Sequence, residues 1–204
     1  MSKLSEIPLF PLKSVLFPKG KLSLQIFEQR YLDLVSTSLK NDTGFGVSLL
    51  KSGHEVVKLG QEQVMHTIGT YARIVDWDQL ENGLLGITVE GEKKFKIEDY
   101  WLTENDLFIG NVIFCESDIA GNTKIPLEDD CSGMAQLLEL LERHPAVQDM
   151  DLQIDHENLW DLGWRLSELI PVAVEIKQEL LELNDPWERI KVIEEAIHFL
   201  SYSK

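Results

Sequence analysis

The sequence predicts an α+β protein with a β-rich first half and a helical second half. Before residue 119, short segments alternate apolar and polar residues, which is typical of half-buried strands. After it, apolar residues recur every three or four positions, as on one face of a helix. The charge also changes: residues 1–118 carry 17 acidic and 12 basic side chains, and residues 119–204 carry 18 and 7. We therefore expect two domains, 1–118 and 119–204.

The first segments predict a strand, a turn and a second strand. Two prolines lie in the apolar segment 7–12, and because proline cannot donate to a sheet, this strand should lie at an edge or be interrupted. Pro18 and Gly20 favour a turn. Leucine and isoleucine then alternate with polar residues over 22–26, which predicts a half-buried strand.

A helix is expected next, because the apolar period changes at Phe27. Phe27, Tyr31 and Leu39 lie at helical spacing, and Glu28 is placed early, where the helix dipole favours an anion. The Asn-Asp-Thr-Gly sequence at 41–44 should end this helix.

Short strands fill the rest of the first domain. The expected segments are 45–49, 55–59, 68–75, 84–89, 94–97 and 107–115. Asn82-Gly83 predicts a hairpin with a type I′ turn, in which both residues have positive φ, and Gly91 should break or bulge the sheet. Six or seven strands with one helix fit a small barrel, closed or nearly closed.

The second domain should be a small helical bundle. Apolar stripes cover 134–141, 159–170, 176–183 and 190–200. Gly163 lies inside the second stripe and predicts close contact with a neighbouring element, and Pro171 should end that helix. Asp185, Pro186 and Glu188 form a capping-box arrangement for the last helix.

Composition limits the function classes. The net charge of −16 disfavours a nucleic-acid partner, and the lysines at 93, 94 and 96 are typical of a solvated strand face. No apolar run is long enough to span a membrane, and the first residues do not form a secretory signal. Two cysteines without a CxxC pattern fit a reducing cytoplasm.

The common catalytic and metal-binding patterns are missing. Residues 18–21 form a turn rather than a phosphate-binding loop, and no GxSxG occurs. His156 lies among carboxylates, which more simply form a solvated loop, and Cys115 lies in an apolar strand. We expect no catalytic residue, no metal site and no cofactor. A hydrolase would need a concave cluster of perturbed titratable groups.

Seven residues are candidates for a binding surface or for the junction between the domains. Trp160 and Trp164 lie one helical turn apart, either as an exposed platform or packed against the barrel. Glu28 and Arg30 could form a structural ion pair or line a groove. The full set is Glu28, Arg30, Trp77, Tyr100, Trp101, Trp160 and Trp164.

Several motifs in order carry a resemblance to a known family. The segment 7–35, IPLFPLKSVLFPKGKLSLQIFEQRYLDLV, closely resembles the opening of the Lon protease N-terminal, substrate-binding domain. GTYARI at 69–74, the hairpin at 82–97 and the helical region at 166–182 resemble later parts of the same domain. The sequence has Lys19 where glycine is common in the family.

The resemblance implies a PUA-like β pseudobarrel with one helix, followed by a C-terminal α-helical bundle. The matching positions are not catalytic in the family, and the sequence ends at Lys204, before the ATPase and Ser-Lys peptidase domains that follow in Lon. It implies a stand-alone, non-enzymatic module that binds proteins or peptides, linked to proteolysis. The alternative is a small-molecule or RNA binder using the barrel. The sequence does not determine the oligomeric state.

Overall fold

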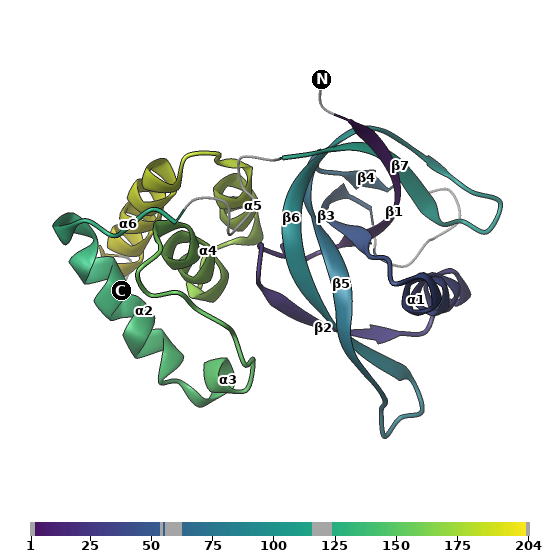
Figure 1. The fold of residues 1–204 in the computed structure, drawn as a ribbon, viewed down its shortest axis with the longest axis horizontal. Helices are drawn as coiled ribbons and strands as arrows, with labels where there is room; N and C mark the ends of the chain where they lie inside the picture. Colours follow the sequence, from purple (N-terminus) through teal and green to yellow (C-terminus); the bar gives the residue numbers. More distant parts are fainter. Residues whose placement is uncertain (1–2, 54, 56–62, 116–123, 203–204) are drawn as a thin grey trace. The chain divides into compact units, whose positions relative to one another are not determined.

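The structure is a computed structural model that describes residues 3–53, 55, 63–115 and 124–202. Within these ranges the fold is mixed α+β, with a β-sheet and several helices (Figure 1). The chain divides into two compact units, Met1–Asp118 and Ile119–Lys204.

The described residues of the first unit form seven strands and one helix. They are β1 (Leu4–Leu12), β2 (Lys21–Ile26), α1 (Gln29–Asn41), β3 (Phe45–Ser52), β4 (Val64–Met65), β5 (Ile68–Gln79), β6 (Leu85–Leu102) and β7 (Phe108–Phe114). The segment 55–59, where a strand was expected, lies outside the described residues except for Glu55.

The strands of this unit pair in a closed path. β1 pairs antiparallel with β7 and parallel with β3, so the order β1-β7-β6-β5-β3 returns to β1. β2 pairs with β6, and β4 pairs with β3. β1 changes partner at Leu9, which pairs with Phe108 of β7 and Gly46 of β3. The strand is therefore interrupted in its pairing and does not lie at an edge. Pro8 lies in the part that pairs with β7, and Pro11 lies in the part that pairs with β3.

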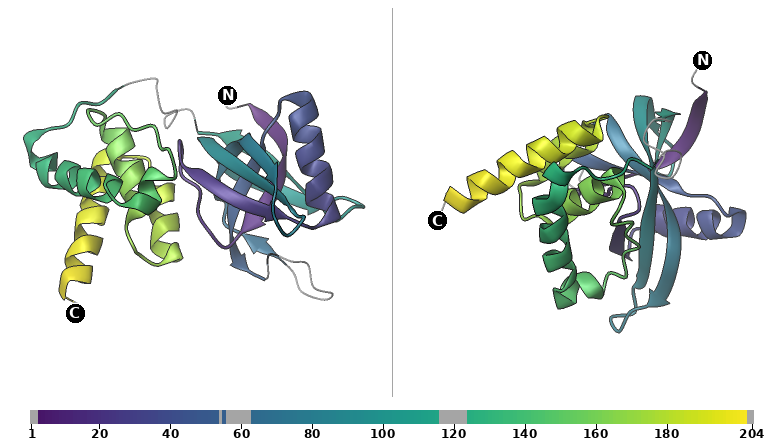
Figure 2. Two further views of the ribbon diagram at one scale, coloured as in Figure 1. Left: turned by 90° about the horizontal axis from the view of Figure 1, so that it is seen from below. Right: turned by 60° about the vertical axis from the view of Figure 1, so that its left-hand side comes forward.

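The described residues of this unit form two core clusters: one lies between the strands and α1, which packs against them (Figure 2), and the other contains only strand residues, among them Leu9 and Phe95. Tyr31, Leu34 and Val35 of α1 are buried against strand residues. Their spacing in the sequence predicted that Phe27 and Leu39 share the apolar face of the helix with Tyr31. That prediction is wrong, because Phe27 is 56% exposed and Leu39 is 45% exposed. The helix begins only at Gln29, after an extended residue, so Phe27 precedes it. Asp42, with φ 51°, ends the helix as expected.

The expected hairpin forms, but its turn type was wrong. Gly83 has φ of 80°, whereas Asn82 is not among the described residues with positive φ. Leu80 donates to the carbonyl of Leu84, and Gly83 donates to the carbonyl of Leu80. These bonds close a three-residue loop with glycine in the left-handed position. The side chain of Asn82 accepts from the Leu84 amide, which favours this loop.

Gly91 lies at a bulge and does not end the strand, since β6 continues to Leu102. Tyr71 pairs with Lys93 and Ala72 with Gly91, so Glu92 is the extra residue. The prediction of a solvated lysine face holds for Lys96 and fails for Lys94, which is 1% exposed although it lies on the same face of β6 as Lys96.

In the second unit, residues 124–202 form five α-helices. They are α2 (Ser132–Glu142), α3 (Pro145–Gln148), α4 (Leu159–Leu169), α5 (Val174–Glu182) and α6 (Pro186–Tyr202). α4 is buried along most of its length and contacts α2, α5 and α6. The Asp185 carboxylate accepts from the amides of Trp187 and Glu188, as a capping residue should. None of the described helices is long and apolar enough to cross a membrane.

Candidate functional site

Arg30 connects the start of α1 to two loops through hydrogen bonds. Its guanidinium donates to Glu28 Oε2 at 3.1 Å, to the carbonyl of Asp106 at 2.8 Å and to the carbonyl of Glu55 at 3.3 Å. It also lies 4.4 Å from the ring centroid of Tyr31. Because Arg30 is 6% exposed, it positions its neighbours rather than meeting a ligand.

A hollow of about 260 Å³ lies beside these residues and follows β2. It is lined by Phe10, Leu12, Ser14, Leu22, Ser23, Leu24, Gln25, Ile26, Phe27, Glu28, Tyr31 and Glu55. We call it the β2 groove. Seven consecutive residues, 22–28, contribute to its wall, so the groove follows β2 from Leu22 onward and reaches the N-cap of α1 at Glu28. Its charged lining residues are the carboxylates Glu28 and Glu55.

Tyr31 lines the groove, but its hydroxyl is buried behind the wall. Its ring stacks on Phe10 with centroids 3.9 Å apart, and the residue is 4% exposed. Within the described part of the chain, its hydroxyl is buried without a hydrogen-bond partner. Such a group costs about 1–3 kcal/mol when it is left unsatisfied. Burial raises the pKa of the Tyr31 hydroxyl well above its usual value.

Tyr31 should make the protein less stable at high pH. The unfolded chain loses the tyrosine proton near about pH 10, whereas the folded chain retains it to higher pH. Above about pH 10 the free energy of unfolding therefore falls, by up to about 1.4 kcal/mol per pH unit. Tyr31→Phe should reduce this decline, as measured by urea unfolding from about pH 9 to pH 11. Equal declines in the variant and the original protein would contradict the assignment.

A second hollow, of about 220 Å³, is lined by residues of β2, β5 and β6. The strand register places Ser23, Thr88 and Asp76 on one face of this sheet. Leu24, Ile87 and Trp77 occupy the opposite face, and Trp77 is 60% exposed near the hairpin. Residues 23–25 line both hollows, so β2 forms their common wall.

Tyr100 and Trp101 lie farther along β6. The ring of Tyr100 meets Phe108 edge-on, with centroids 5.7 Å apart, and packs against the core. Trp101 is 40% exposed. The structure therefore gives these neighbours different environments, as expected for successive residues of a strand.

In the second unit, Trp160 and Trp164 surround a buried cation. Their rings stack with centroids 6.0 Å apart, and the guanidinium of Arg189 lies 3.4 Å from the Trp164 centroid. Trp164 and Arg189 are both 0% exposed. Arg189 Cδ would lie 3.2 Å from a Cβ added at Gly163, which is the close contact expected at that glycine. Trp164 offers no exposed surface to a ligand.

From the sequence, Tyr31 was expected in the first helix, but neither its hydroxyl nor Arg189 was among the candidate residues. Arg189 lies four residues before the buried Ile193, so the helical period could have placed it on the buried face. No local pattern in the sequence indicates that the Tyr31 hydroxyl is unsatisfied.

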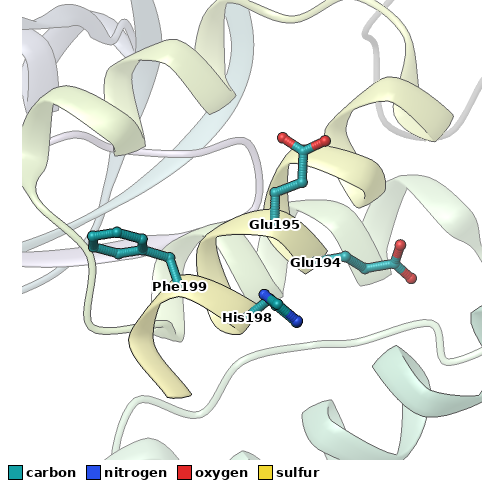
Figure 3. Close-up of a pocket in the computed structure, with 4 residues that line it drawn as sticks. All are labelled: Glu194, Glu195, His198 and Phe199. Carbon is teal, nitrogen blue, oxygen red and sulfur yellow. The ribbon is translucent and has the colours of Figure 1, made fainter. Parts of the chain in front are cut away.

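A more open hollow of about 580 Å³ lies along α6 (Figure 3). Its lining side chains, Glu194, Glu195, His198 and Phe199, point in different directions from the helix.

His156, which the sequence places among carboxylates, has its Nε2 atom 3.3 Å from Oε1 of Glu142. Among the described residues, no group of three or more potential metal ligands is placed to hold an ion.

Comparison with protein families gives a match over most of the chain. Residues 6–198 match the model of the ATP-dependent protease La (LON) substrate-binding domain. The chain is 24% identical over 192 residues to Lon protease of Brevibacillus choshinensis, covering 92% of this chain and 24% of that protein. It is 25% identical over 199 residues to Lon protease 2 of Myxococcus xanthus, covering 94% and 23%. The chain thus spans about a quarter of the length of these curated relatives.

Solved structures show the same likeness. A Lon N-terminal domain protein from Xanthomonas campestris aligns with a TM-score of 0.72 at 28% identity, covering 98% of this chain and 99% of that one. The N-terminal domain of Lon protease from the Mycobacterium avium complex aligns with a TM-score of 0.63 at 15% identity, covering 98% and 100%. The second likeness concerns the fold alone.

Proposed function

The chain belongs to the family of the ATP-dependent protease La (LON) substrate-binding domain, and from this we propose that it is a polypeptide-recognition module linked to proteolysis. The observation that carries the proposal is the family match over residues 6–198. The module binds protein segments and catalyses no reaction, and it acts in the cytoplasm. Two free cysteines are compatible with that compartment.

The proposed architecture gives each unit a name and a role. The first, 1–118, is a PUA-like pseudobarrel, and the closed strand path through β1, β7, β6, β5 and β3 supports this assignment. The second, 119–204, is a helical bundle lobe built around α4. Recognition takes place on the first unit, which combines two hollows with exposed aromatic residues.

Among the candidate residues, exposure separates ligand contacts from structural groups. Glu28 lines the β2 groove, and Trp77 and Trp101 are exposed. Arg30 and Trp164 are buried in contacts within their own units and act structurally.

The proposal predicts preferential binding of unfolded polypeptide. The probe is reduced, carboxamidomethylated α-lactalbumin carrying a fluorescent label, with the native protein as control. Both are acidic, so they should not adhere to a chain of net charge −16 through charge alone. Fluorescence anisotropy at about 0.15 M salt should show at least about tenfold tighter binding of the unfolded form. The absence of binding to the unfolded form would overturn the proposed function.

A further inference from the structure

β2 is paired along one edge, whereas its other edge has no strand partner over residues 22–26 among the described residues. It pairs with β6 from Lys21 to Ile26. Over residues 22–26, no second strand pairs with β2 in the part of the chain that the structure describes. An unpaired strand edge presents a row of amide and carbonyl groups that another extended chain can bind.

The β2 groove lies along this strand and extends past its end. Its wall takes in every residue from Leu22 to Glu28. Leu22, Leu24 and Ile26 contribute the apolar face of β2, while Ser23 and Gln25 are exposed on the other face. In a strand added beside β2, alternate side chains would lie about 4.5–5.5 Å from these leucines. A groove of this length suits an extended backbone better than a compact small molecule.

We propose that the β2 groove binds an extended polypeptide segment as an additional strand beside β2. One large apolar side chain of the segment enters the groove between Leu22, Leu24 and Tyr31, and exposed Phe27 covers it at the end near α1. This proposal rests on the proposed function and specifies how the polypeptide is recognised.

The polar atoms of the groove restrict the segment further. Its charged lining residues, Glu28 and Glu55, are both acidic, so the segment is neutral or basic rather than acidic.

Backbone methylation of the ligand tests the added strand without altering the protein. The probe is a peptide of about ten residues, a common strand length, with lysine at each end, serine alternating with valine, and one central phenylalanine. Two matched versions carry N-methyl groups on alternate amides, so that each blocks one edge of the peptide. The version methylated on the edge that faces β2 should bind at least about tenfold more weakly. The version methylated on the opposite edge should bind like the parent.

Protein variants test the position of the segment. Phe27→Ala should weaken binding of the parent peptide about fivefold or more, with the fold retained. The matched control is Phe199→Ala, at a residue that is 73% exposed on α6; it should leave binding unchanged.

The possible outcomes separate this inference from the proposed function. If unfolded α-lactalbumin binds but both methylated peptides bind like the parent, strand addition is overturned and the polypeptide-binding function stands. If neither unfolded α-lactalbumin nor the peptide binds, both fail. A concentration-dependent dimer that the parent peptide cannot dissociate would assign the edge to a second copy of the chain and overturn the proposal.

Discussion

Replacing Arg189 by alanine is expected to lower the free energy of unfolding of the helical unit by about 3–5 kcal/mol. Arg189 Nε donates to the carbonyl of Leu180 at 3.0 Å, and Nη2 donates to that of Leu183 at 2.5 Å. These carbonyls lie at the end of α5, where no further helical turn is available to supply donors. The guanidinium also stacks on Trp164, and a buried cation–π contact contributes about 2 kcal/mol.

Urea unfolding followed by far-ultraviolet circular dichroism measures this effect. Lys191→Ala is the matched control, because it removes a cation from an exposed position of the same helix and should change the free energy of unfolding by less than about 0.5 kcal/mol. Arg189→Lys should retain only part of the stability, since an ammonium cannot reproduce the planar fork. A loss below about 1 kcal/mol for Arg189→Ala would show that the stack is dispensable.

The sequence predicted the elements of the fold well where local chemistry determines them. Asp185 and Pro186 mark the start of α6 because they supply an acceptor and a fixed φ at its first turn. The errors occur where distant contacts decide. Three nearby lysines suggest a solvated strand face, yet Lys94 is buried while Lys96, on the same face of β6, is exposed, and no local pattern distinguishes the two.

The candidate site was less predictable, because it depends on pairing that no short segment encodes. Residues 22–26 read as a half-buried strand from their alternation alone. Over residues 22–26, one edge of this strand has no strand partner among the described residues. This arrangement depends on how β6 and β1 pair with strands that are distant in the sequence. Tyr31 likewise fits an apolar helical stripe, and its unsatisfied hydroxyl depends on what surrounds it after folding.

Replacing Gly91 by alanine is expected to destabilise the first unit by about 3–4 kcal/mol. A Cβ at this position would lie 2.3 Å from the carbonyl oxygen of Phe17 and 2.9 Å from Cγ2 of Thr70. The turn that contains Phe17 cannot move away freely. Lys19 donates to the Gly91 carbonyl at 2.6 Å, and the Gly91 amide donates to Gly20 at 2.9 Å.

The same substitution should also weaken peptide binding, because this turn leads directly into β2. The Thr70 hydroxyl donates to the carbonyl of Leu16 at 2.6 Å, so a displaced turn breaks a buried bond and shifts the start of β2. Hydrogen exchange should show faster exchange of the β2 amides in Gly91→Ala, together with an affinity for the parent peptide at least about tenfold lower. Gly133→Ala is the matched control: a Cβ there has no atom within 4 Å, and within α2 it should stabilise by up to about 1 kcal/mol. If Gly91→Ala leaves both exchange and affinity unchanged, the turn is not what positions β2.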